Sequence, residues 1–386
     1  MIKLGIEKLI EKPPFWIKNK KLGLLCNQAS VNSQLIHSRF LIKNKFNNKL
    51  KILFSPQHGL FSEKQDNMKE SVHSFDTELN IPIFSLYSET RTPTDEALEL
   101  IDILLIDLQD CGTRVYTYIW TMLLAMKKCA EKEIAVCVLD RPNPIGGDIV
   151  EGNILWEDLY SFVGLAPLPM RHGLTIGELA LFFRDYFNLD LELHIIKMEG
   201  WQRRYYFDET GLTWVLPSPN MPHLQTAIVY PGQVILEGTN LSEGRGTTRP
   251  FEIFGAPYLN VNDFLKQLGE VNGAILRFQA FEPTFNKWQG KRCLGAQVHI
   301  TNRNKFKPYR FTLKMLNTLF KLQDEISWTA PPYEYNYVDL PADLIIGNKT
   351  IRLMVESGAD FSEIEEVLER DEKKFLELRA PFLLYR

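Results

Sequence analysis

The sequence predicts an α/β protein built on a doubly wound, mainly parallel sheet, followed by a second, smaller α+β domain. Three observations predict this arrangement. Short apolar runs alternate with helix-compatible segments, most of these runs end in polar residues, and the pattern changes near residue 258. Alternation of strands and helices is typical of parallel sheets, in which helices form the crossovers. A length of 386 residues also favours two domains over a single core.

The first predicted domain covers residues 1–257. Five apolar runs predict strands buried on both faces, because they lack the polar alternation of a half-exposed strand. Between them, segments 92–101 and 116–133 are compatible with helices, and Thr94 is a candidate N-cap for the first. The predicted strands lie within residues 21–30, 50–59, 81–87, 101–110 and 134–144.

Polar side chains follow the carboxyl ends of these predicted strands. In doubly wound sheets, ligands bind beyond this edge, where neighbouring crossovers diverge. A single Asp or Asn there usually caps a helix or forms a turn, but such caps do not call for Gln, His, Tyr and Arg as well. We therefore predict a ligand site at this edge, formed by Asn27, Gln28, Gln57, His58, Tyr87, Asp107, Gln109, Asp110, Asp140, Arg141 and Asn143.

Polar loops in the middle third extend the predicted site. In segment 171–187, Thr175 and Glu178 have capping-box spacing, which does not explain Arg171 and His172. Segment 230–257 has glycines that let backbone approach a ligand, and arginines that could bind a carboxylate or phosphate. The alternative is an arginine-rich turn tied to neighbouring acids. The polar residues of the later loops are Asn220, Glu237, Asn240, Glu243, Arg245 and Arg249.

The second predicted domain, residues 258–386, alternates strand and helix patterns with fewer polar clusters. We expect it to line the site, and we interpret the charged helix at 362–379 as a solvated face. The net charge of −4 gives no electrostatic case for a nucleic acid or an anionic membrane as partner.

The cysteines and the N-terminal segment predict a cytoplasmic protein. The five cysteines are scattered without CxxC spacing, which suits buried thiols in a reducing compartment. The start, MIKLGIEKLIEKPPFW, lacks the continuous apolar core of a secretory signal, and no later segment reaches transmembrane length.

Several familiar chemistries lack their motifs. The sequence contains no GxxxxGK[ST], no GxGxxG after the first strand, no HExxH and no GxSxG. We therefore expect no cofactor and no metal. The abundant carboxylates beside Asn, Gln, Arg, Tyr and Trp suit a carbohydrate site instead. Glycoside hydrolysis needs one carboxylic acid as proton donor, and either a second carboxylate or the substrate's acetamido group at the anomeric carbon.

Six motifs of the sequence resemble those of a known protein family. The chain resembles the exo-β-N-acetylmuramidase (NamZ) family in PQHGLFSEKQDN, DLQDCGTRVYTYIWTM, DRPNPIGG followed by VEG, RHGLTIGELA, PSPNMP and EGTNLSEGRGTTRPFE. The resemblance implies a Rossmann-like catalytic domain, a smaller C-terminal domain and a cleft between them. It also implies release of non-reducing-end N-acetylmuramic acid from β-1,4-linked peptidoglycan fragments, with a muropeptide or disaccharide as substrate. Relatives can be exported.

The resemblance also points to a departure at Gln57, because relatives carry Glu there and Gln cannot deliver a proton. We favour Glu63, in the same loop, as the general acid, with His58 tuning it or holding a hydroxyl. Asp110 and Glu243 are candidates for the second carboxylate, for orienting the acetamido group, or for the acid itself. For Glu63 the alternative is an exposed loop residue paired with Lys64. For the whole chain the alternative is a catalytically silent protein that binds or senses muropeptides.

Substrate binding has its own candidates. The lactyl carboxylate of muramic acid supplies a reason for one of four arginines to face the site, but the sequence does not choose between Arg245, Arg249, Arg171 and Arg91. A weaker hypothesis, a hydrolase or transferase acting on a phosphorylated or acidic sugar, rests on EGRGTTR. The predicted substrate-binding residues are Asn27, Gln57, His58, Arg91, Gln109, Arg114, Tyr116, Arg141, Asn143, Arg171, His172, Asn220, Asn240, Arg245 and Arg249.

Overall fold

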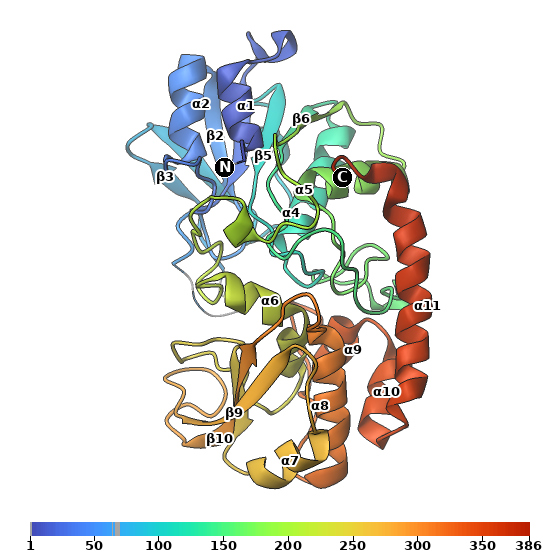
Figure 1. Ribbon diagram of the computed structural model, residues 1–386. Coiled ribbons are helices and arrows are strands. Elements are labelled where there is room, and N and C mark those ends of the chain that lie inside the picture. The colour runs from blue at the N-terminus through green and yellow to red at the C-terminus, as the bar shows by residue number, and fades with distance from the viewer. Residues whose placement is uncertain (1, 64, 66–69) are drawn as a thin grey trace.

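The computed structural model describes residues 2–63, 65 and 70–386. A seven-stranded sheet forms the centre of the first domain, with all neighbouring pairs parallel except the one at the β3 edge (Figure 1). The predicted α/β fold class is confirmed. The strand order is β3-β4-β2-β1-β5-β6-β7, with β1 (Leu22–Cys26), β2 (Leu50–Ser55), β3 (Ser74–Asp76), β4 (Ile81–Ser85), β5 (Ile103–Asp107), β6 (Ala135–Leu139) and β7 (Leu193–Ile196).

Helices cover both faces of this sheet because successive strand residues point to opposite sides. Leu24 and Leu25 are neighbours in β1, yet they belong to two different apolar clusters. The cluster of Leu24 includes residues of the first two helices, and that of Leu25 includes residues of the next three. The helices are α1 (Gly5–Glu11), α2 (Ser38–Phe46), α3 (Asp95–Leu98), α4 (Tyr118–Glu131) and α5 (Ile176–Tyr186).

Two predicted helix starts are confirmed. The Thr94 side chain accepts a hydrogen bond from the backbone N–H of Ala97 and so caps α3. Thr175 and Glu178 form a reciprocal capping box at the start of α5. Each cap satisfies backbone N–H groups that have no partner within the helix, and therefore fixes where the preceding loop ends.

The second domain holds a three-stranded antiparallel sheet of order β8-β10-β9, with helices packed beside it. Helix α6 (Leu224–Gln233) packs against α8 (Pro308–Leu322). The strand β8 (Ile253–Ala256), which precedes the predicted boundary at 257, pairs with β10 (Cys293–Ile300). The boundary itself stays a prediction. The other elements are β9 (Ala274–Phe281), α7 (Val261–Leu268), α9 (Pro341–Ile346), α10 (Lys349–Ser357) and α11 (Phe361–Arg379).

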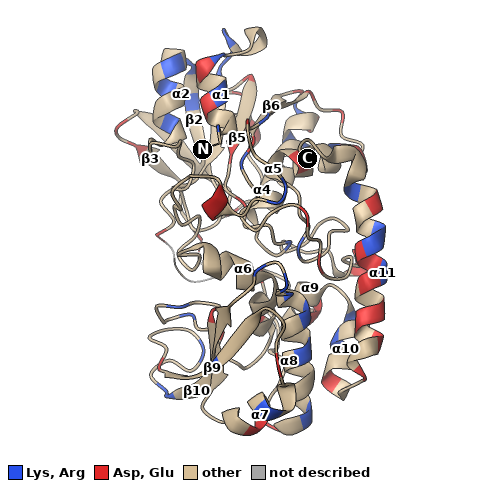
Figure 2. Cartoon of the chain, in the orientation of Figure 1, with Lys and Arg blue, Asp and Glu red and all other residues tan. Residues whose placement is uncertain are grey.

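The long helix α11 brings the chain back to the first domain. One of its faces is charged, as predicted, and Figure 2 shows acidic and basic residues alternating along it. Its other face buries Ile364, Leu368 and Phe375, and the Phe375 ring meets Phe182 of α5 edge-on at 6.3 Å. The charged sequence pattern therefore marks only half of this helix. None of the described helices is long and apolar enough to cross a bilayer.

Candidate active site

A polar pocket lies at the carboxyl edge of the large sheet, where the two domains meet. Gln57 and His58 follow β2, and residues 115–118 lead into α4. Residues 218–221 close one side. The second domain and the segment leading to it supply the remaining wall, formed by Tyr230, Glu237, Arg245, Phe251, Tyr333 and Glu334. Of the residues with a predicted binding or catalytic role, five line this pocket: Gln57, His58, Tyr116, Asn220 and Arg245.

Glu334 is a buried carboxyl group in this pocket. The hydroxyl of Tyr87 donates a hydrogen bond to its Oε2 at 2.6 Å, and Nε2 of Gln57 donates to its Oε1 at 3.2 Å. Burial raises the pKa of Glu334, the two hydrogen bonds act in the opposite direction, and the charge of Glu237 raises the pKa further. Because the net shift is upward, Glu334 holds a proton more readily than an ordinary glutamate.

The turn that carries Glu334 is tight and unusual. The backbone groups of Tyr333 and Asn336 exchange two hydrogen bonds of 2.9 Å, and both central residues have left-handed φ angles, 43° at Glu334 and 67° at Tyr335. Such turns favour Gly or Asn, and each side chain held there costs on the order of 1 kcal/mol or more. Strained residues of this kind concentrate at functional sites, so the turn itself points to a role for Glu334.

Glu237 is the second carboxyl group in the pocket, and its surroundings favour the ionised form. It lies in a 3₁₀ turn, Val234–Gly238, that follows α6. Nη2 of Arg245 is 2.6 Å from its Oε1, and the Tyr333 hydroxyl donates to its Oε2 at 2.6 Å. Burial opposes ionisation, but the charge of Arg245 and these hydrogen bonds outweigh it, so the pKa of Glu237 is lowered. Two carboxyl groups whose pKa values are pushed apart can divide acid and base roles.

The carboxylates predicted from the sequence lie elsewhere. Glu63 is exposed, and its carboxylate lies beside Gly59. A Cβ atom added at Gly59 would be 3.4 Å from Oε2 of Glu63. Its suggested partner Lys64 lies outside the described residues. Glu243 is buried between Arg245 and Lys287, 3.0 Å from the ammonium of Lys287. None of these carboxylates lines the pocket, nor does Asp110, whose Oδ2 accepts from the Gly112 N–H at 2.7 Å and lies 3.3 Å from Nε2 of His172. Their catalytic roles stay predictions.

Several other predicted binding residues hold the scaffold together. Arg114 is fully buried and donates to the carbonyls of Leu344, Ile345 and Ile346 at the end of α9. Arg141 forms a two-pronged ion pair with Asp107 at 2.6 and 2.9 Å. The remaining residues of this kind bond mainly to backbone carbonyls: Asn27 to Pro217, Gln109 to Pro142, Asn143 to Leu174 and Asn240 to Glu325.

The four candidate arginines differ in their partners. Arg245 is bound to Glu237, Arg249 is half-exposed and pairs with Glu252, and Arg171 is buried beside the Tyr206 hydroxyl. Arg91 contacts two aromatic rings that stand edge to face, with centroids 6.0 Å apart, and its Nη1 donates to the Ser88 carbonyl at 2.6 Å. Its guanidinium lies 4.1 Å from the Tyr87 ring centroid and 4.4 Å from that of Tyr335. Among the described residues, no carboxylate forms an ion pair with Arg91.

Comparison with known proteins agrees with this architecture. A family model described as the N-terminal domain of exo-β-N-acetylmuramidase NamZ matches residues 22–225, and one for the C-terminal domain matches residues 228–385. The chain belongs to the NamZ family. A peptidoglycan β-N-acetylmuramidase NamZ from Bacillus subtilis is 40% identical over 388 residues, covering 100% of this chain and 91% of that protein.

Solved structures extend the NamZ comparison to three dimensions. A DUF1343 family protein from Bacteroides fragilis superimposes with a TM-score of 0.89 at 32% identity, covering 100% of this chain and 99% of that one. A second protein of the same description and organism gives a TM-score of 0.78 at 28% identity, with the same coverage. The two NamZ family models divide the chain between residues 225 and 228, at the start of α6.

Glu334, an acidic residue that lines the pocket, is not among the residues predicted from the sequence. Glu334 stands in APPYEYNYVDLP, where one carboxylate is flanked by tyrosines in a loop. That pattern resembles the aromatic and acidic mixture of a sugar site and was a usable signal. The sequence pattern after residue 258, with few polar clusters, predicts a supporting domain and so draws attention away from this loop. Glu237 was recognised as part of a polar loop but received no role.

Proposed function

We propose that this member of the NamZ family releases terminal N-acetylmuramic acid from β-1,4-linked peptidoglycan fragments, with Glu334 as the proton donor. The observation that carries the residue assignment is the pair of buried carboxyl groups in one pocket, with pKa values shifted in opposite directions. The similarity to the Bacillus subtilis enzyme supports the reaction class.

In the proposed reaction, protonated Glu334 gives its proton to the glycosidic oxygen as the bond from that oxygen to the anomeric carbon breaks. A water molecule finally supplies a hydroxyl to the anomeric carbon and a proton to the enzyme. Ionised Glu237 is placed in the same pocket to assist at the anomeric carbon, either directly or by orienting the substrate's acetamido group. After proton transfer, the donors on Tyr87 and Gln57 stabilise the Glu334 carboxylate.

This assignment gives Gln57 a function that needs no acidic proton. The Thr117 hydroxyl donates to Oε1 of Gln57 at 2.6 Å, which turns the Gln57 amide nitrogen toward Glu334. A glutamate at position 57 would put a second negative charge against Glu334 and raise the pKa of the pair. We therefore propose that Gln57 positions the acid.

We further propose that Arg91 binds the lactyl carboxylate of muramic acid. Its guanidinium contacts the rings of Tyr87 and Tyr335 and lies close enough to Glu334 to lower that group's pKa. Arg245, by contrast, is already engaged by Glu237. A planar guanidinium suits two-pronged binding of a carboxylate.

Chromogenic substrates test these proposals. We expect release from an N-acetylmuraminide and not from the matching N-acetylglucosaminide, which lacks the lactyl group. Glu334→Gln should lower release by roughly 10²- to 10⁴-fold, while Glu63→Gln, at an exposed position, should retain activity if Glu334 rather than Glu63 is the acid. Full activity of Glu334→Gln would overturn the residue assignment. Turnover of phosphosugars alone would instead favour the acidic-sugar hypothesis.

A catalytically silent muropeptide-binding protein is the second candidate, motivated by Gln57 at the position where relatives carry Glu. Tight binding of a muropeptide without release would support it.

We also propose a cytoplasmic location, supported by five free cysteines that are all buried. Fractionation of cells, with the protein detected by antibody, tests that location.

A further inference from the structure

The amino edge of the large sheet, opposite the pocket, carries a concentration of lysines. A hollow beside the starts of β1 and β2 is lined by nine residues, of which five are lysines and none is acidic. Its polar amides come from the 3₁₀ turn Asn47–Lys49, and Nζ of Lys49 bonds the Asn19 carbonyl at 3.3 Å, which joins this turn to the loop before β1. We call this surface the lysine-rich end: Lys18, Lys21, Lys45, Lys49 and Lys51.

Within the part of the chain that the structure describes, no ion pair neutralises the charge of this end. Lys12, Lys20 and Lys43 add to it from the same segments. Within the described residues, no carboxylate forms an ion pair with any of these eight lysines. One carboxylate contacts this end: Asp102 accepts a hydrogen bond from the backbone N–H of Lys21 at 2.7 Å. Glu133 precedes β6, and Glu192, which precedes β7, is paired with His194 at 2.9 Å.

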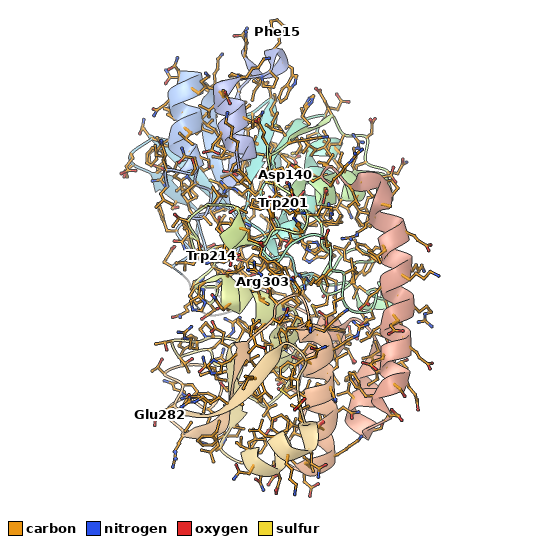
Figure 3. The ribbon with its side chains drawn as sticks, viewed as in Figure 1. Phe15, Asp140, Trp201, Trp214, Glu282 and Arg303 are labelled. Carbon is orange, nitrogen blue, oxygen red and sulfur yellow. The ribbon has the colours of Figure 1, made fainter. Side chains whose placement is uncertain are left out.

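An exposed aromatic ring stands beside the lysines. Phe15 is 87% exposed, in the 3₁₀ turn Phe15–Ile17, and Figure 3 shows it at the outer tip of the first domain. Nζ of Lys18 lies 5.6 Å from its ring centroid. The base of this turn is fixed, because Trp16 stacks on His194 at 4.0 Å and Ile17 is buried. The anchored turn therefore presents an apolar ring to water directly beside the lysines, where burial of the ring in a bound surface would be favourable.

We propose that the lysine-rich end and Phe15 dock the protein on an anionic bilayer surface. Lysines attract the phosphate groups of anionic lipids from a short distance, and an aromatic ring at the tip enters the headgroup region. A soluble polyanion would use the lysines but would leave Phe15 in water, so the ring favours a bilayer. The charge of the whole chain, −4, averages over this local excess.

Docking in this way leaves the pocket accessible. Parallel strands run from the lysine-rich end to the pocket, so the two sites occupy opposite edges of one sheet. When the protein is bound through the amino edge of its large sheet, the pocket faces the bulk solution. It would therefore act on released fragments that diffuse to it, rather than on material within the bilayer plane.

Vesicle co-sedimentation of the full chain tests the proposal. We expect binding to vesicles of phosphatidylglycerol mixed with phosphatidylcholine, none to phosphatidylcholine alone, and loss of binding at high salt. The double variant Lys18→Glu/Lys45→Glu should weaken binding at least about tenfold. Phe15→Ser should weaken it about three- to tenfold, since a buried apolar contact is lost.

Matched controls separate docking from general charge or hydrophobicity. Lys373→Glu/Lys374→Glu makes the same charge change on the exposed face of α11, and Phe278→Ser removes a ring that is 48% exposed on β9. Both should leave vesicle binding unchanged, and all four variants should keep activity on a soluble muraminide. The proposal is overturned if the wild type ignores vesicles, if the controls lose binding equally, or if soluble polyphosphate binds with no effect of Phe15→Ser on vesicle binding.

Discussion

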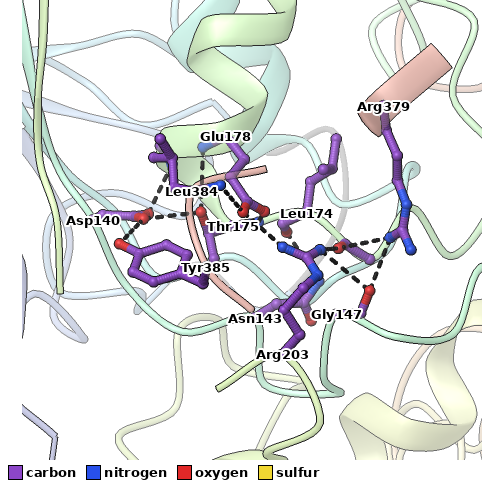
Figure 4. Close-up of polar contacts among 12 residues, drawn as sticks. Asp140, Asn143, Gly147, Leu174, Thr175, Glu178, Arg203, Arg379, Leu384 and Tyr385 are labelled. Atoms are coloured by element: carbon purple, nitrogen blue, oxygen red, sulfur yellow. Dashed lines mark hydrogen bonds and ion pairs between the residues drawn. The ribbon is translucent and has the colours of Figure 1, made fainter. Parts of the chain in front are cut away.

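Glu334 and Asp140 are both buried carboxyl groups whose pKa burial raises, yet their surroundings differ. Asp140 follows β6 and accepts four hydrogen bonds, from Tyr385, Thr175, Gly177 and the Arg141 N–H, as Figure 4 shows for the first of these. Glu334 accepts two and lines a pocket. A raised pKa alone therefore does not identify a catalytic acid. Access to a ligand distinguishes the pair.

The Asp140 site is closed by the end of the chain. The Tyr385 hydroxyl donates to Asp140 at 2.6 Å, and the Leu384 N–H donates to Glu178 at 2.7 Å. Glu178 also pairs with Arg203 at 2.6 Å, which completes the network in Figure 4. These contacts fasten the C-terminal segment to the first domain and leave Asp140 no free oxygen to present to a ligand. We interpret Asp140 as a structural residue.

The largest expected effect separates the two residues by activity. Glu334→Gln should lower kcat on a chromogenic muraminide by roughly 10²- to 10⁴-fold, the range for loss of a general acid, while the midpoint of thermal unfolding changes little. Asp140→Asn should retain most of the activity. Equal losses of activity in both variants would show that access to the pocket does not separate a catalytic carboxyl group from a structural one.

Effects on protein stability should be larger at Asp140 than at Glu334. Burial raises the pKa of Asp140 from an ordinary value of 3.8 to about 7. The folded state then binds the proton more tightly than the unfolded state, so this contribution to stability is complete below pH 3.8 and is lost as pH rises through 7. The upper limit is about 4 kcal/mol at 1.36 kcal/mol per unit. Asp140→Asn should remove this loss, measured as a flatter dependence of the unfolding midpoint on pH between about 4 and 7. Parallel profiles for the two proteins would contradict it.

Selectivity gives a third and smaller effect at the pocket. Arg91→Gln should lower kcat/KM for the muraminide substrate about 10- to 100-fold, because a charge-assisted pair with the lactyl carboxylate is lost. Arg249→Gln is the matched control, since Arg249 is half-exposed and bound to Glu252. An equal loss in both variants would point away from Arg91.

The smallest expected effect concerns the pH profile. The protonated form of Glu334 is the active one in our proposal, so activity should fall as pH rises through its raised pKa. The hydrogen bond from Tyr87 lowers that pKa. Tyr87→Phe should therefore move the basic limb of kcat/KM to higher pH. A basic limb that stays in place would mean that another group controls it.

Much of the fold could be predicted from local patterns. The apolar runs predicted five strands that the structure contains, and the caps at Thr94 and Thr175 mark real helix starts. The polar residues at strand ends do gather along one edge. Their individual roles could not be predicted, because several of them, like other predicted binding residues, bond to carbonyls far away in sequence. Arg114, for example, is committed to carbonyls some 230 residues later.

The sequence by itself determined the sheet, the caps, the carboxyl edge that carries the pocket and the family, because periodicity, turn chemistry and motifs are local properties. Tertiary structure decided which carboxyl groups share the pocket. Glu237 and Glu334 meet there only because the second domain folds its turn at 333–336 against Tyr87 and Gln57 of the first. Burial and charge at that junction set the two pKa values, and both depend on packing between segments that are distant in the chain.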